Sequence, residues 1–395
     1  MAVTAEKAGR HSILFRRIKS AIFLSGLSVF AQLYVFQPLL PLLCKHFRIT
    51  PAQSSYAVSA STLGMATGLI FFSFKADTIS RKRLMSGSLL VSSALTLLSA
   101  VMPQFEWLIA LCFLKGAVLS GVSAVALAYL SEEVSPEALG LAISLYLSGN
   151  AIGGMAGRIV AILISGWLNW QWAVGTIGAT SFVFGLLFMR QLPPSAHFVP
   201  QLVPAALKVR QMWQFVRNPF TVRIYCVAFL LMGSFVAVYN YLGFRLEAPP
   251  FSLPHYIIAG IFLMYTAGVT GSMMASRWSE RVAPIRLVKR FIVLMLGGLS
   301  LLLAPVLAGI IIGLGLFTFS FFGANTIVSR LLSEYVSEGK STATSLYWLF
   351  YYAGASVIGS STGVVLAHST WGLFVMLLML LTLISLCLFW ADRKR

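Results

Sequence analysis

Charged side chains are scarce in this chain, and acidic ones are the scarcest. Charged residues make up 10% of the 395 residues, whereas soluble domains contain about 25%. The hydrophobic fraction is 58%, which is more apolar surface than one soluble core can bury, so we expect a lipid bilayer around the chain. A net charge of +18 would indicate nucleic-acid binding in a soluble protein. In a membrane protein it indicates basic cytoplasmic loops, so we expect no nucleic-acid partner.

The residues that several kinds of chemistry require are also missing. The four cysteines (Cys44, Cys112, Cys226 and Cys387) lie far apart and form no CxxC pair. They indicate small apolar packing residues rather than a metal site or a disulfide. The sequence contains no HExxH and no phosphate-binding loop, which argues against zinc-dependent hydrolysis and against ATP-driven pumping. We therefore expect no enzymatic activity, no metal and no cofactor.

No acid falls in the middle of a long apolar segment. The eleven acids all lie in loops or at segment ends: Glu6, Asp77, Glu106, Glu132, Glu133, Glu137, Glu247, Glu280, Glu334, Glu338 and Asp392. Carboxylates within the membrane are the usual proton carriers of secondary transporters. Coupling of transport to protons would therefore need a different titratable group. A transporter of simple cations would also need a buried acid to bind the cation, and no predicted span offers one in its middle.

Twelve segments are apolar and long enough to cross a bilayer, which takes about 20 residues each. They cover 20–43, 54–74, 84–102, 106–130, 139–166, 172–190, 222–245, 254–276, 287–304, 306–329, 341–366 and 370–391. A polar, proline-containing stretch separates the first six from the last six. We expect an all-α membrane protein with six-helix halves at 20–190 and 222–391, joined by a cytoplasmic linker at 191–221. Cytoplasmic segments 1–19 and 392–395 would flank these halves.

The basic residues predict the orientation. If the chain crosses twelve times, most of the 29 Lys and Arg residues fall on the side that holds both termini and the linker. Lys and Arg are enriched in cytoplasmic loops. We therefore expect both termini in the cytoplasm, and an uncleaved first span rather than a signal peptide.

One stretch of the first half recurs in the second half. Residues 131–158, SEEVSPEALGLAISLYLSGNAIGGMAGR, share their outline with residues 333–359, SEYVSEGKSTATSLYWLFYYAGASVIG. An offset of about 200 residues predicts two related halves. In the first copy one helical face carries Tyr146, Asn150, Gly153, Gly154, Gly157 and Arg158. Asn150, Gly157 and Arg158 are replaced in the second copy, so this face is a candidate gate or solute contact, with plain packing as the alternative.

Two loops carry matching charges, and the first resembles a family signature. The loop SFKADTISRKRL resembles the GxxxDRxGRR loop of the major facilitator superfamily, with Asp77, Arg81 and Lys82 in register. It departs from that pattern at Ser73, Thr78 and Ser80, and the corresponding loop of the second half keeps Glu280, Arg281 and Arg286. Ion pairs there would hold one state of a gate and break in the other. The alternative is ordinary cytoplasmic basic charge.

The stretch LSGNAIGGMAGR resembles the Gly-rich antiporter signature of drug-efflux members of that superfamily, without its usual Gly-Pro pair. Gly149, Gly153, Gly154 and Gly157 are expected to let two helices pack closely. The strings YLSEEV, FLLMGSF and SLYWLFYYAGAS resemble a bacterial inner-membrane transporter over nearly the whole chain. The resemblance implies the superfamily's fold and efflux of small molecules, as in multidrug antiporters.

Lys115 and Arg158 are the charged residues expected inside spans. A charge at membrane depth is costly and needs a partner or a wet cavity, so both are candidate solute ligands, with snorkelling to the outer interface as the alternative. In the register where antiporters of the superfamily tend to carry Arg and Gly, this chain has Cys112 and Gly116. Lys115 is the in-span base that could release a proton if burial lowered its pKa.

Amide and phenol groups within spans supply the remaining solute candidates. They are Tyr34, Gln37, Asn150, Tyr239, Asn240, Asn325, Tyr347 and Tyr351. Such groups need hydrogen-bond partners in a low-dielectric setting, and a solute or water can provide them. Aromatic rings would suit flat solutes. The alternative for the tyrosines is the aromatic belt at the membrane interface.

The leading hypothesis is a monomeric secondary transporter of the bacterial inner membrane that works by alternating access. Lipid and a small organic solute, neutral, aromatic or anionic, would be its partners. Efflux is favoured, with proton coupling left open. The alternatives are an importer or facilitator of a neutral or anionic solute, and a non-transporting membrane sensor with a transporter fold.

Overall fold

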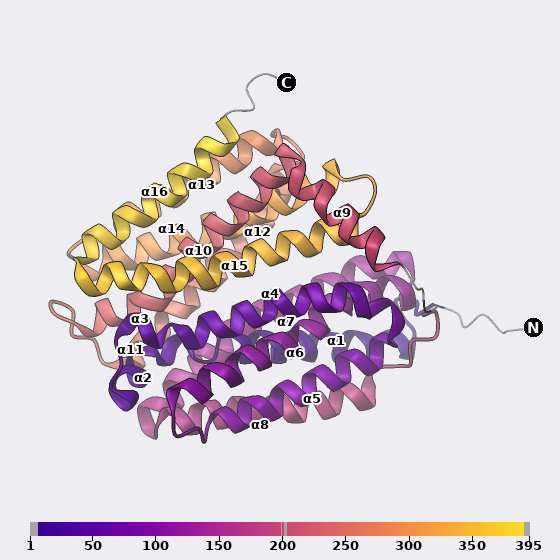
Figure 1. Ribbon diagram of the computed structural model, residues 1–395, viewed down its shortest axis with the longest axis horizontal. Coiled ribbons are helices and arrows are strands. Elements are labelled where there is room, and N and C mark those ends of the chain that lie inside the picture. The colour runs from indigo at the N-terminus through magenta and orange to yellow at the C-terminus, as the bar shows by residue number, and fades with distance from the viewer. Residues whose placement is uncertain (1–6, 199, 201–203, 391–395) are drawn as a thin grey trace, which may run out of the picture. The chain divides into compact units, whose positions relative to one another are not determined.

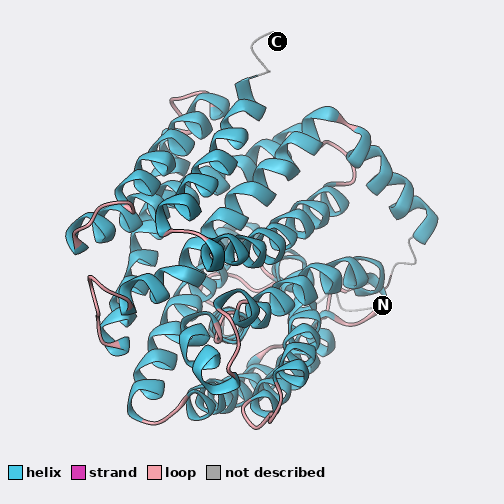
Figure 2. Cartoon of the chain, turned by 60° about the vertical axis from the view of Figure 1, so that its left-hand side comes forward, coloured by secondary structure: helices cyan, strands magenta, loops and turns pink. Residues whose placement is uncertain are grey.

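The computed structural model describes residues 7–198, 200 and 204–390. Regular structure in this part of the chain is helical, apart from one isolated parallel bridge between Ala8 and Val134 (Figures 1 and 2). The long helices are α1 (Ile13–Leu33), α4 (Tyr56–Lys75), α5 (Arg81–Ser99), α6 (Phe105–Glu133), α7 (Pro136–Trp167), α8 (Trp170–Gln191), α10 (Pro219–Glu247), α12 (Tyr265–Trp278), α13 (Pro284–Leu301), α14 (Leu307–Tyr335), α15 (Lys340–His368) and α16 (Trp371–Trp390). Shorter elements are η1 (Gln37–Leu39), α2 (Leu40–Phe47), α3 (Pro51–Ser54), η2 (Ala76–Thr78), α9 (Ala205–Arg217), α11 (His255–Ile258) and η3 (Ala259–Met264).

Several helices begin at a polar residue whose side chain caps the first turn. Ser12 accepts a hydrogen bond from the backbone of Phe15 at the start of α1, and Asn169 accepts one from Trp172 at the start of α8. Asn218 does the same for α10. Each cap satisfies backbone N–H groups that have no partner within the helix.

Ten stretches of described helix are long and apolar enough to cross a membrane, and they coincide with ten of the twelve predicted spans. The other two predicted spans, 84–102 and 287–304, overlap α5 and α13, which are helical but do not meet that criterion. Helix α5 is rich in serine, and α13 begins with basic residues. Both features lower the apolar character of the helix without preventing it from packing among other helices.

The first predicted span, 20–43, lies within an apolar helical stretch at Ile13–Phe47, but the helix is interrupted there. Helix α1 ends at Leu33, residues 34–36 form a turn, and η1 and α2 follow. Pro38 and Pro41 explain the break, because proline provides no backbone donor and clashes with the preceding turn.

The chain forms two compact units, Met1–Phe36 with Ala60–Lys208 and Gln37–Ser59 with Val209–Arg395. In the first unit α1 packs against α7 and α8, and α5 packs against α6 and α8. In the second unit α10 packs against α15, and α14 packs against α12 and α13. Each unit therefore has its own core. The predicted halves at 20–190 and 222–391 stay a prediction.

Candidate functional site

Glycines bring α7 against the backbone of α1 in the first unit. A Cβ atom added at Gly153 would lie 2.3 Å from the carbonyl oxygen of Leu27, and one at Gly149 would lie 2.6 Å from that of Phe23. At Gly157 it would lie 2.8 Å from the Cα atom of Ala31. Only glycine permits this spacing, because real Cβ contacts are not this short. The close packing carries the next residue of α7, Arg158, to the end of α1.

Arg158 lies over an aromatic ring at the break in the first span. Its Cζ atom is 4.4 Å from the centroid of the Tyr34 ring. Its Nη1 donates to the carbonyl oxygen of Gly154, one turn earlier on α7, at 2.5 Å. The side chain is 2% exposed. A guanidinium stacked on a ring keeps further N–H groups in a fixed plane, which suits the recognition of a carboxylate.

Lys115 of α6 lies over the second ring of the same turn. Its Nζ is 4.8 Å from the centroid of the Phe36 ring, and the residue is fully buried. Within the described residues this Nζ has no hydrogen-bond partner. An ammonium group carries three donors, and leaving them unpaired in a dry interior costs free energy. A bound anion, water or loss of the proton would relieve that cost.

The two cations lie at similar depths. Lys115 is ten residues from the start of α6 and Arg158 is nine residues from the end of α7, which corresponds to about 15 Å and about 14 Å of helix. Those two helix ends face the same membrane side, because α6 and α7 are consecutive and run in opposite directions. We call Tyr34, Phe36, Lys115 and Arg158 the cation–aromatic cluster.

Other predicted residues of the first unit lie near this packing. The Oδ1 atom of Asn150 is buried without a hydrogen-bond partner among the described residues. It lies 2.7 Å from the position of a Cβ atom at Gly26 of α1. Gly154 faces the Nη1 atom of Arg158 and the side chain of Phe30. Asn150 therefore offers one unsatisfied acceptor on the α7 face that bears Arg158.

The predicted amides of the second unit bind each other. Gln37 donates from Nε2 to the Oδ1 atom of Asn240 at 2.8 Å, and Asn240 donates to the carbonyl oxygen of Gly359 at 3.1 Å. Tyr239 and Thr318 share a hydrogen bond of 2.8 Å between their hydroxyl groups. These bonds link η1, α10, α14 and α15, so the polar groups are satisfied within protein.

A second pair of predicted residues meets between α14 and α15. The hydroxyl of Tyr347 donates to the Oδ1 atom of Asn325 at 2.5 Å. The Tyr347 and Tyr351 rings are stacked with centroids 6.2 Å apart. The second unit therefore groups its candidates as neutral amides and phenols, whereas the first unit groups cations with rings.

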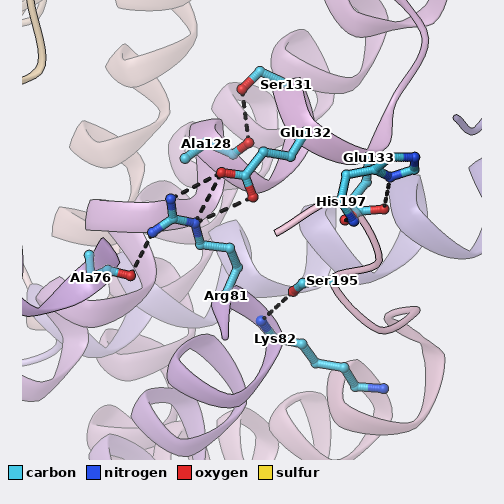
Figure 3. Close-up of polar contacts among 9 residues, drawn as sticks. All are labelled: Ala76, Arg81, Lys82, Ala128, Ser131, Glu132, Glu133, Ser195 and His197. Carbon is cyan, nitrogen blue, oxygen red and sulfur yellow. Dashed lines mark hydrogen bonds and ion pairs between the residues drawn. The ribbon is translucent and has the colours of Figure 1, made fainter. Parts of the chain in front are cut away.

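At the turn between α4 and α5, Arg81 forms an ion pair with Glu132 near the end of α6, a partner that the sequence did not predict (Figure 3). Arg81 donates from Nη2 to the Oε1 atom of Glu132 at 3.0 Å and from Nη1 to the carbonyl oxygen of Ala76 at 2.6 Å. The backbone N–H of Lys82 donates to the Oγ atom of Ser195. The predicted gate residue Asp77 has a side chain outside the described part of the structure. In the other loop Glu280 and Arg281 are exposed.

Glu133, next to Glu132 in sequence, holds the linker to the first unit. Its carboxylate accepts from the backbone N–H of His197 at 2.8 Å and lies 2.9 Å from the Nδ1 atom of the same residue (Figure 3). The N-terminal segment joins the same loop, because Ala8 donates to the carbonyl oxygen of Glu133 at 2.8 Å. We call Ala8, Glu133 and His197 the linker latch. The sequence analysis did not predict these contacts. The adjacent acids Glu132 and Glu133, at the end of a predicted helix, were the feature that could have indicated them.

Comparison with known proteins identifies the family. The model of the Major Facilitator Superfamily matches residues 22–360. The chain is 36% identical over 358 residues to the uncharacterized MFS-type transporter YybF of Bacillus subtilis (strain 168), covering 91% of this chain and 89% of that protein. It is 36% identical over 378 residues to the inner membrane transport protein YnfM of Escherichia coli (strain K12), covering 94% and 89%.

Solved structures agree on the fold. The nucleoside transporter NupG is similar with a TM-score of 0.77 at 14% identity, covering 97% of this chain and 100% of that chain. The relatives and the family are transporters rather than enzymes, and the chain is a multi-pass membrane transporter. On the family match, the two full-length relatives and the fold, this chain belongs to the major facilitator superfamily.

Proposed function

We propose that the chain is a secondary transporter of small organic carboxylates with an aromatic or other flat apolar body. The observation that carries this proposal is the buried Nζ of Lys115, which has no hydrogen-bond partner among the described residues. A carboxylate would accept from this ammonium and from Arg158, while its apolar body would lie against Tyr34 and Phe36.

An anion fits the charge pattern better than a cation. The sequence places no acid in the middle of any predicted span, so a cationic solute would meet Lys115 and Arg158 without a counter-charge. Like charges at a few ångströms in a low-dielectric site repel strongly. A neutral solute would leave the ammonium unpaired. An anion pairs both cations and removes the cost of their burial.

We further propose that the chain exports its solute by alternating access. In such a mechanism the solute site opens to one side of the membrane at a time, as one repeat moves against the other. Export is favoured because the stretch around Gly153 resembles the antiporter signature of efflux members. Proton coupling, if present, would use Lys115, since it is the titratable base of the cation–aromatic cluster.

Flux into proteoliposomes tests the solute class. Purified protein would be reconstituted and supplied with labelled benzoate, benzamide and benzylamine, which share a ring and differ in charge. We expect saturable flux of benzoate and background flux of the other two. Saturable flux of benzylamine without benzoate flux would refute the proposed class. A pH gradient imposed in either direction would then show whether protons contribute and which way the solute moves.

A further inference from the structure

The second unit has an apolar groove at the turn between α12 and α13. The groove has a volume of about 390 Å³ and is lined by Trp278, Val282, Leu287, Arg290, Phe291 and Leu294. The α13 residues recur at intervals of three and four, so they form one face of that helix. Trp278, the last residue of α12, stacks on Phe291 with ring centroids 6.0 Å apart. The groove is thus built by aromatic packing where one helix ends and the next begins.

The groove opens at the exposed surface of the unit. Trp278 is 40% exposed and Leu294 is 39% exposed, and neither belongs to the cation–aromatic cluster. In a membrane protein, exposed apolar side chains of a helix contact lipid chains. Tryptophan at a helix end marks the depth of the lipid headgroups. A lipid chain entering here would have its headgroup beside the turn.

The segment that forms the groove is rich in basic residues. Residues 277–290 contain five Lys or Arg and one acid, Glu280. Arg290 is exposed and lies in the groove wall, and no ion-pair partner for it is found in the described part of the chain. A guanidinium beside an apolar groove matches a phosphate carried on an acyl chain.

We propose that this groove binds one anionic phospholipid, with an acyl chain along Trp278 and Leu294 and the phosphate at Arg290. Basic charge near the membrane favours a lipid of net negative charge over a zwitterionic one with the same chains. The site is separate from the proposed solute site, so it does not depend on the solute class.

Lipid binding to the purified full chain tests the proposal. Native mass spectrometry would count bound phosphatidylglycerol and phosphatidylcholine with identical acyl chains. We expect tighter binding of phosphatidylglycerol, and about fivefold weaker phosphatidylglycerol binding in Arg290→Gln. Arg190→Gln, which removes an exposed arginine at the end of α8, is the matched control and should bind as the wild type does.

A second variant tests the groove itself. Leu294→Trp fills the groove without changing charge, so it should weaken the binding of both lipids. Phosphatidylglycerol with brominated chains should quench tryptophan fluorescence less in Trp278→Phe than in the wild type. Equal binding of the two lipids by the wild type, or Arg290→Gln and Leu294→Trp both binding within twofold of it, would overturn the proposal.

Discussion

Both cations of the cation–aromatic cluster lie over an aromatic ring, Arg158 on Tyr34 and Lys115 on Phe36. A charged residue at the centre of a bilayer costs about 3 kcal/mol on insertion scales, and a cation–π contact returns about 1–2 kcal/mol. The rings therefore offset only part of the cost. A bound anion would offset the rest of the cost of burying these charges, which is the physical basis of the proposed solute class.

The ring under Arg158 can be tested by substitution. Tyr34→Leu keeps an apolar side chain but removes the cation–π contact, so the guanidinium is no longer held in its plane. We expect the KM for benzoate flux to rise about tenfold, within the range that a desolvated cation–π contact supports. Tyr34→Phe keeps the ring and should transport with a KM near that of the wild type. Equal KM values for Tyr34→Leu and Tyr34→Phe would show that the ring does not contribute to solute binding.

At the scale of the element, glycine spacing sets how close α7 lies to α1. Gly153→Ala would force a methyl group to within 2.3 Å of the Leu27 carbonyl oxygen, so the helices must separate. Overpacking of this kind costs about 1–3 kcal/mol, which we expect as a lower melting temperature in detergent. Gly140→Ala in the same helix is the control, because a methyl group there meets nothing within 4 Å and alanine favours a helix. A Gly153→Ala melting temperature at or above that of Gly140→Ala would contradict this packing.

The linker latch gives a second test at this scale. Glu133→Gln removes the charge that His197 contacts and should weaken the attachment of the linker to the end of α6, since charged hydrogen bonds exceed neutral ones. We expect limited proteolysis to cut the linker severalfold faster than in the wild type. Glu137→Gln, an exposed acid in the first turn of α7, removes the same charge outside the latch. Cleavage that is equally fast in both variants would show that the latch does not hold the linker.

For the whole molecule, hydropathy and the internal repeat predicted the helical membrane architecture, and the resemblance to the superfamily signature added the transporter fold. Ten of the twelve expected spans are long, apolar helices. The break after Leu33 was missed, although Pro38 and Pro41 signalled it. Hydropathy depends only on residue type, so it predicts an apolar segment but not the position at which the backbone hydrogen bonds of its helix are interrupted.

The sequence alone did not predict which side chains contact each other in the folded chain. The sequence placed Lys115, Arg158 and Tyr34 among the solute candidates, but nothing in it paired Lys115 with Phe36, which is 79 positions away. The same holds for Arg81 with Glu132 and for Glu133 with His197. Such pairs depend on helix rotation and packing, which a single sequence does not specify.

Benzoate flux in Lys115→Gln proteoliposomes tests the central claim most directly. Glutamine keeps the side chain polar and similar in length but removes the charge that the proposed anion neutralises. Lys19→Gln, which removes an exposed lysine of α1, is the matched control. We expect Lys115→Gln to lose at least tenfold in benzoate flux at equal reconstituted amounts, while Lys19→Gln transports like the wild type. Wild-type flux in Lys115→Gln would contradict the account.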